Sequence, residues 1–120
     1  MNVEIDLFSG RPNPRFALAP DDVTDLVRRL TALPPATDQA PTPVLGYRGM
    51  RITDDTGESP FTEVQVVRGT AVLHDRHGDR HLFRDPDRAL ERRLLDLAAP
   101  HVESAVVGLV RQELGSPGHA

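Results

Sequence analysis

The sequence predicts an α+β protein in which a mostly antiparallel sheet of four to five strands packs on an N-terminal helix and a kinked C-terminal helix or helix pair. Apolar and polar residues alternate in residues 2–7 and in several runs between residues 50 and 84, which is the period of a strand with one buried face. Apolar residues recur at spacings of three and four in residues 20–33 and 86–114, which indicates amphipathic helices.

The first strand is expected where Val3, Ile5 and Leu7 alternate with polar residues. The first helix is expected to begin at Pro20, because proline is favoured at the first helical position, and to end before Pro34-Pro35. Its apolar stripe contains Val23, Leu26, Val27, Leu30 and Leu33.

The proline-rich residues 34–43 predict a surface linker. Residues 44–53 predict a strand that is interrupted at the two glycines of GYRG, and residues 54–60 predict a turn. Residues 63–73 predict either two strands joined at Arg68-Gly69 or one strand with a bulge there, and residues 74–79 predict a hairpin tip before a short strand at 81–84.

Asp85-Pro86 is a typical helix start, with Asp85 as the capping residue. Pro100 divides the helical pattern that follows, so that one helix kinks there or two helices meet. The second half carries the stripe Val102, Val106, Leu109, Val110 and Leu114. We expect one domain over residues 1–115 and a flexible C-terminal tail at 116–120.

Composition excludes several classes of function. The 120 residues contain no Cys, which excludes disulfides and thiolate chemistry, and all 14 basic residues are Arg, which excludes lysine-based catalysis. The net charge of −4 and the few aromatic residues argue against a nucleic-acid partner. Without a long apolar run or a leader pattern, the chain is expected to be cytoplasmic and to make no membrane contact.

Two loops that combine glycine with arginine are the candidate ligand-binding elements. In SGRPNP, residues 9–14, two prolines stiffen a corner that presents Arg11 and Asn13; in GYRG, residues 46–49, glycines flank Tyr47 and Arg48. If the loops lie side by side, these four side chains form a polar cluster suited to a carboxylate or phosphate. The alternatives are a corner whose arginine pairs with an internal acid, and a β-bulge whose tyrosine packs at the core edge.

HDRHGDRH, residues 74–81, is a weak candidate for a metal site through His74, His77 and His81. On the expected hairpin, His74 and His81 would be cross-strand neighbours, and Asp75 and Asp79 could orient the imidazoles. Gly78 argues against a helix here, and a charged hairpin tip is the simpler interpretation.

FSGRPNP, the helix starting at Pro-Asp, the proline-rich gap, LGYRG and DPDRALERRLLD together resemble a group of small uncharacterised bacterial proteins. The resemblance covers residues 3–53 and 85–96. The resemblance implies that the two Gly-Arg loops are a defining feature of the group, and it implies no catalytic role. It also makes a metal site at the three histidines less favoured.

No motif assigns an activity. The first hypothesis is a binding or accessory module that recognises an anionic small molecule, a peptide or a partner protein through Arg11, Asn13, Tyr47 and Arg48, without a cofactor. The alternative is a small cofactor-independent enzyme that tailors a metabolite or peptide, with Tyr47 or a loop histidine as acid or base. A His-ligated metal protein is the third. An exposed strand edge and the valines at 106, 107 and 110 would suit a homodimer.

Overall fold

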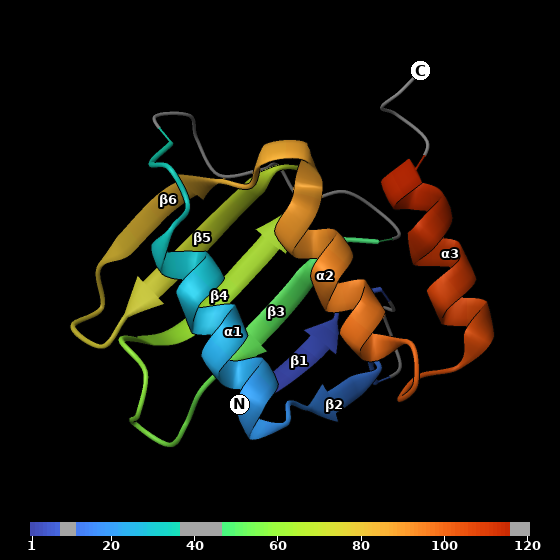
Figure 1. Cartoon of the computed structure of the whole chain (residues 1–120), viewed down its shortest axis with the longest axis horizontal. Coiled ribbons are helices and arrows are strands. Elements are labelled where there is room, and N and C mark those ends of the chain that lie inside the picture. The colour runs from blue at the N-terminus through green and yellow to red at the C-terminus, as the bar shows by residue number, and fades with distance from the viewer. Residues whose placement is uncertain (8–11, 37–46, 116–120) are drawn as a thin grey trace.

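The structure, a computed structural model, describes residues 1–7, 12–36 and 47–115. These residues form one antiparallel sheet of six strands in the order β2-β1-β3-β4-β5-β6, together with three α-helices (Figure 1). The strands are β1 (Asn2–Ile5), β2 (Arg15–Ala17), β3 (Met50–Thr53), β4 (Phe61–Val67), β5 (Thr70–Asp75) and β6 (Arg80–Arg84). The helices are α1 (Pro20–Thr31), α2 (Ala89–Ala98) and α3 (Ser104–Gly115). The predicted α+β class is confirmed, with six strands instead of four to five because β2 was not expected.

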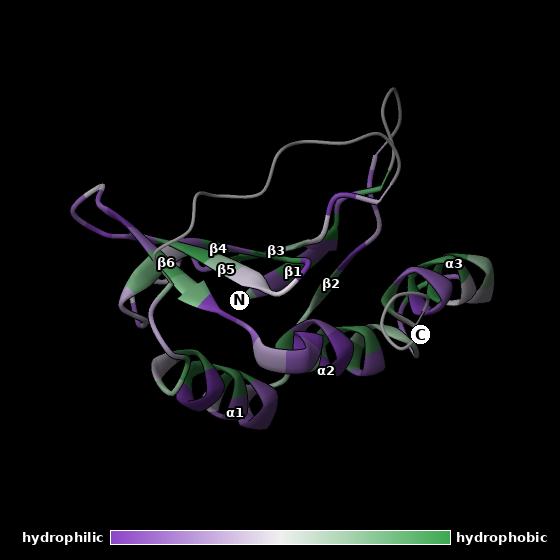
Figure 2. Cartoon of the chain, turned by 90° about the horizontal axis from the view of Figure 1, so that it is seen from above, coloured by the Kyte–Doolittle hydropathy of each residue, from purple (hydrophilic) through white to green (hydrophobic). Residues whose placement is uncertain are grey.

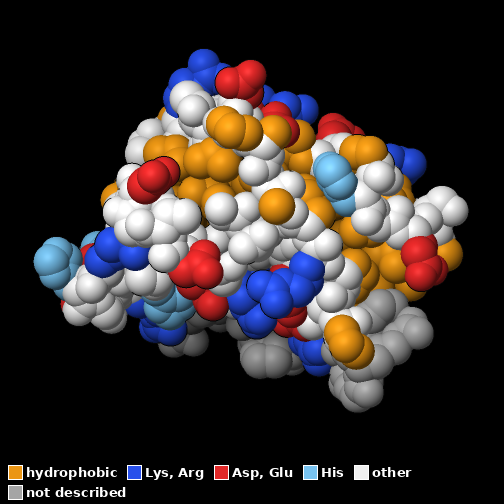
Figure 3. Space-filling view, turned by 90° about the horizontal axis from the view of Figure 1, so that it is seen from below, with side chains coloured by type: hydrophobic (Ala, Val, Ile, Leu, Met, Phe, Trp, Pro, Cys, Tyr) orange, Lys and Arg blue, Asp and Glu red, His pale blue; other side chains and the backbone are white. Residues whose placement is uncertain are grey.

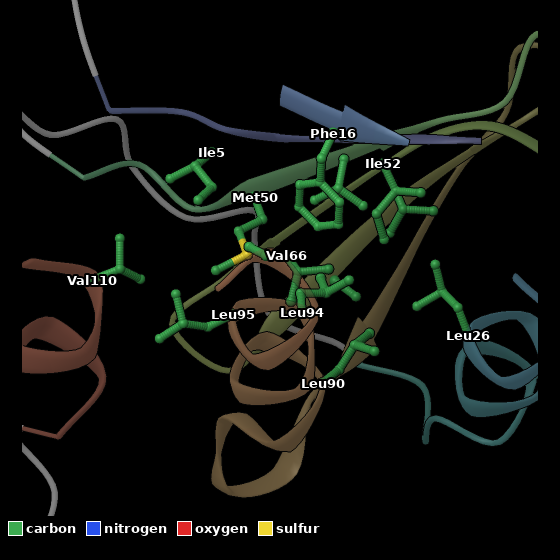
Figure 4. Close-up of a cluster of buried hydrophobic side chains, with 14 of the residues drawn as sticks. Ile5, Phe16, Leu26, Met50, Ile52, Val66, Leu90, Leu94, Leu95 and Val110 are labelled. Atoms are coloured by element: carbon green, nitrogen blue, oxygen red, sulfur yellow. The ribbon is translucent and has the colours of Figure 1, made fainter. Parts of the chain in front are cut away.

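The helices α1 and α2 lie on one side of the sheet, and α3 lies beyond the sheet end formed by β1 and β2 (Figure 2). Strand alternation sends Val3, Ile52 and Val64 to this side, since these residues are cross-strand partners in register. All three belong to one buried core with the leucines of the helices, and Figure 4 shows Ile52 on the same side of the sheet as Leu26 and Leu90. Each such side chain contributes about 1.5–3 kcal/mol by leaving water. The helix side of the sheet is therefore where the core lies.

Two turns depend on left-handed backbone. Gly49 has a φ of +98°, and a Cβ there would lie 2.5 Å from the Cβ of Val67, so only glycine fits. Arg68 and Gly69 both have positive φ and join β4 to β5 as a two-residue hairpin turn, as predicted.

The start of the C-terminal helical region differs from the prediction. A single 3₁₀ turn (Pro86–Arg88) precedes α2, and both Asp87 and Arg88 have left-handed φ angles. The carboxylate of Asp85 nevertheless accepts hydrogen bonds from the backbone N–H groups of Leu90 and Glu91, at 2.8 and 3.1 Å. Asp85 thus supplies the capping bonds expected of it, but from across the intervening turn.

Two separate helices, α2 and α3, meet around Pro100, which settles the choice between a kink and a helix pair. Val106, Val107 and Val110 are buried in the core, so these valines are not available for the dimer surface suggested by the sequence. Leu109 was expected in the buried stripe but is 47% exposed. The predicted tail, residues 116–120, lies outside the described residues. No helix in the described ranges has the length and apolar character needed to cross a bilayer.

Candidate functional site

Asn13 holds the corner between β1 and β2 in place. Its side-chain oxygen accepts the backbone N–H of Leu7 at 2.9 Å, and its side-chain nitrogen donates to Glu4 at 2.9 Å. These bonds lie within the corner itself. The side chain that was predicted to face a ligand therefore connects residue 13 to β1 and to Leu7, which closely follows that strand. Arg11, the first residue of the predicted cluster, lies outside the described residues.

Arg48 is paired with an internal acid. Its Nε and Nη2 lie 3.1 and 2.9 Å from Oδ1 of Asp6, and its backbone N–H donates to the carbonyl of Asp6 at 2.8 Å. Arg51 lies 3.6 Å from the other oxygen of Asp6 and 3.7 Å from Glu4. Arg15 lies 3.8 Å from Glu4. On the polar face of β1, β2 and β3, each of the two acids, Glu4 and Asp6, thus contacts two arginines, and Arg51 is shared between them.

Tyr47 is 4% exposed and belongs to a different cluster from Arg48. Its hydroxyl donates to Oε2 of Glu91, a residue with no exposed surface. Burial, together with the charge and the hydrogen bond of Glu91, raises the pKa of Tyr47 far above its ordinary value of 10.0. Tyr47 and Arg48 are neighbours in sequence, but their polar atoms bind separate acids, and the structure does not bring them together over one opening.

Glu91 accepts four hydrogen bonds and is the centre of this buried cluster. Besides Tyr47, Nε and Nη2 of Arg88 donate to it at 2.8 and 3.1 Å, and the backbone N–H of Arg68 donates at 3.2 Å. Arg88 and Arg68 both have left-handed backbone. Arg88 also reaches the carbonyl of Glu113 at 3.4 Å, which connects the cluster to the last turn of α3.

The sequence contained a signal for Glu91 that the prediction missed. Position 91 lies three, four and seven residues before Leu94, Leu95 and Ala98, so it falls on the buried stripe of α2. A carboxylate on such a stripe requires buried partners, and Arg88, three residues earlier, is the natural one.

The groove that we name the corner groove lies between residues 12–15 and the first half of α3, and has a volume of about 490 Å³. Its polar lining consists of Asn13, Arg15, His101 and Glu103. Its apolar lining consists of Leu7, Pro12, Pro14, Val102, Ala105, Val106 and Leu109. The ring of His101 stacks on Phe16 of β2, with 5.2 Å between centroids and 5° between planes. Figure 3 shows hydrophobic side chains that reach the surface with charged side chains among them.

The two edge strands of the sheet, β6 and β2, differ in whether other described backbone pairs with their outer side. Along β6, residues 34–36 of the predicted linker lie against the strand: Ala36 N–H donates to the carbonyl of Leu82 at 2.9 Å, and Arg84 N–H donates to Pro34 at 2.8 Å. Along β2, nothing within the described ranges pairs with the outer side of the strand. The open edge lies beside the corner groove, because Arg15 belongs to both.

The three histidines of the β5–β6 hairpin are not gathered. His74 pairs with Arg80 and His81 pairs with Leu73, so the two imidazoles leave opposite faces of the sheet. The expectation that they are cross-strand neighbours is wrong by one residue of register. Nε2 of His81 lies 2.9 Å from Asp75, and this hydrogen bond, with those from the backbone of Asp79 and His77, lowers the pKa of Asp75 to about 2. Among the described residues, no group of three or more acidic or histidine side chains could hold a metal ion.

A second buried acid, Asp54, organises the predicted turn at 54–60. Its carboxylate accepts hydrogen bonds from the hydroxyl and N–H groups of Thr56 and Ser59, and Nη2 of Arg76 lies 3.1 Å away. Burial acts to raise the pKa of Asp54, but the hydrogen bonds from Ser59 and Thr56 outweigh it and hold the pKa well below 3.8. This turn forms one wall of a second groove of about 570 Å³, which α1 closes on the other side.

No family model, curated protein or solved structure matches the chain.

Proposed function

We propose that the protein is a small binding module that takes up an extended segment of a partner protein in the corner groove. The observation that carries this proposal is the outer edge of β2, with which no described residue pairs, beside an apolar groove and in a sheet whose other edge is covered by residues 34–36. Domains that bind peptides by strand addition gain main-chain hydrogen bonds from an edge and side-chain contacts from an adjacent groove.

The lining of the groove is consistent with a peptide ligand. A single exposed leucine is ordinary on a protein surface. Leu109, however, lies in the groove with the prolines of the corner, so that a side chain placed there would remove several apolar groups from water at once. In this proposal Asn13 and Arg48 support the corner through Glu4 and Asp6. Binding through Arg11 stays a prediction.

The second groove is the natural control. It has a similar volume and an apolar floor that includes Val27. Its lining touches the end of β2 only at Leu18, whose backbone N–H donates inward to the carbonyl of Met1 at 3.0 Å, and neither Arg15 nor Ala17 lines it. An aspartate introduced there adds the same charge as one introduced in the corner groove. A loss of binding seen only for the corner groove is then due to the position of the charge and not to the charge itself.

Selection of a random-peptide display library on the wild-type protein tests the proposal. The retained peptides are then measured by isothermal titration against Leu109→Asp and Val27→Asp, after circular dichroism has shown that both variants are folded. We expect Leu109→Asp to weaken binding by at least about tenfold, and Val27→Asp to leave it unchanged. The proposal fails if no peptide is retained, or if the retained peptides lose affinity only for Val27→Asp.

A small cofactor-independent enzyme stays the alternative, and one observation favours it. The His81 imidazole, oriented by Asp75, borders a groove of about 520 Å³ at the hairpin tip, and an imidazole held by a carboxylate can act as a general base. Wild-type protein that hydrolyses p-nitrophenyl esters faster than His81→Gln would support this function. Equal rates would remove it.

A further inference from the structure

The register of β2 determines which of its backbone groups face outward. Ile5 N–H donates to Pro14 at 2.9 Å and Leu18 N–H donates to Met1 at 3.0 Å, so Pro14 and Leu18 turn their ladder groups toward β1. In an antiparallel ladder these groups alternate between inward and outward. Arg15 and Ala17 therefore direct their N–H and C=O groups away from β1, and among the described residues none bonds to these groups.

An added strand would find four backbone groups at the spacing of an antiparallel partner. Residues of the partner opposite Arg15 and Ala17 would each exchange two hydrogen bonds with this edge. We take the antiparallel direction because every strand pair in the sheet is antiparallel and because parallel pairing is less stable per residue.

Side-chain alternation then assigns a chemistry to each partner position. Partner residues opposite Phe16 and Pro14 point to the helix side, where they meet the apolar lining of the corner groove and the stacked ring of His101. Partner residues opposite Arg15 and Ala17 point to the polar face. The first of these lies beside the Arg15 guanidinium, whose side chain is 61% exposed and whose only acidic contact among the described residues is Glu4 at 3.8 Å.

We infer that the partner segment is an antiparallel strand that reads polar, apolar, acidic, apolar, with the acidic residue opposite Arg15. This inference rests on the proposed function and names the chemistry of its ligand. The position of the acid is specific, because Glu103 lines the helix side of the groove and would repel an acid on the neighbouring apolar positions.

Two synthetic peptides test the pattern, each acetylated and amidated: Ser-Thr-Val-Asp-Val-Thr-Ser, and the same peptide with lysine in place of aspartate. Their affinities are measured by isothermal titration at low salt against wild type, Arg15→Gln and Arg15→Glu. We expect wild type to bind the aspartate peptide at least about tenfold more tightly than the lysine peptide. Arg15→Gln should remove this preference and Arg15→Glu should reverse it, while Leu109→Asp weakens both peptides.

Two outcomes would overturn the inference and leave the proposed function in place. One is equal affinity of both peptides for wild type, with binding lost in Leu109→Asp. The other is that display-selected peptides bind the corner groove, while the two synthetic peptides do not bind and the selected sequences lack the polar, apolar, acidic, apolar pattern. If no peptide from either source binds, the proposed function falls as well. If the wild-type chain is itself a dimer that Leu109→Asp dissociates, the occupant is a second copy and the inference is overturned.

Discussion

Replacement of Arg88 by methionine should strongly destabilise the fold, because it leaves the Glu91 carboxylate buried with half of its hydrogen bonds. Glu91 has no exposed surface, and Arg88 supplies two of its four donors, at 2.8 and 3.1 Å. Removing one member of a buried ion pair costs about 3–5 kcal/mol. Against a total stability of about 5–15 kcal/mol for a domain of ordinary size, this is a large fraction.

A second substitution separates the cost of the unpaired Glu91 charge from the cost of the packing contacts that are lost with the Arg88 side chain. In Arg88→Met/Glu91→Gln the buried group is neutral and its oxygen can still accept from Tyr47 or Arg68, so we expect the double variant to recover at least about 1.5 kcal/mol. Urea unfolding followed by far-ultraviolet circular dichroism measures both effects. Arg111→Met, at an exposed position of α3, is the control and should change stability by less than about 0.5 kcal/mol. A loss below about 1 kcal/mol for Arg88→Met, or a double variant as unstable as the sum of the single ones, would refute the reasoning.

Three other outcomes follow from groups already described. Gly49→Ala should cost at least about 2 kcal/mol of stability in thermal unfolding, because its Cβ would collide with Val67. Gly108→Ala, which has open space in α3, should instead stabilise the fold by up to about 1 kcal/mol. The reverse order of stabilities would contradict this account of the packing. The raised pKa of Tyr47 means that stability falls as pH rises above 10.0, so tyrosinate absorbance should appear only with unfolding, and an early titration in folded protein would contradict its burial. The lowered pKa of Asp54 stabilises the fold above pH 3.8, and this contribution is lost as pH falls below that value; Asp54→Asn should therefore show a shallower acid loss, and an unchanged slope would exclude this role.

The sequence was sufficient to predict a helix or strand wherever one face of that element is buried over several residues. The alternation in β1 and β3 and the stripe of α1 report that burial directly, and the helix start at Pro20 was placed correctly. It was insufficient for β2, because Arg15–Ala17 is too short to show a period and is held mainly by pairing with β1. Leu109 illustrates the same limit, since one residue of rotation decides whether a position at the margin of a stripe is covered.

The candidate site depended on strand register and on contacts between residues far apart in the sequence, and the local residue pattern contains neither. The loop length of the β5–β6 hairpin sets its register, and an offset of one residue separated His74 from His81. Tyr47 and Arg48 were singled out as ligand-binding residues, but the acids that bind them, Asp6 and Glu91, come from distant segments that the local pattern does not indicate. The outer edge of β2, which is unpaired among the described residues, could not be predicted because the strand itself was not predicted.

The position of α3 has a consequence for the protein at high concentration. This helix packs chiefly on α2, follows a short connection that contains Pro100, and is held at its far end by the Arg88 and Arg92 side chains on the carbonyls of Glu113 and Leu114. Detachment of α3 would expose its valine and leucine face together with the surface of α2 that this face covers, and the two exposed surfaces of one molecule would fit those of another. We therefore expect reciprocal exchange of α3 between two chains to be the route by which crowding or mild denaturant produces dimers.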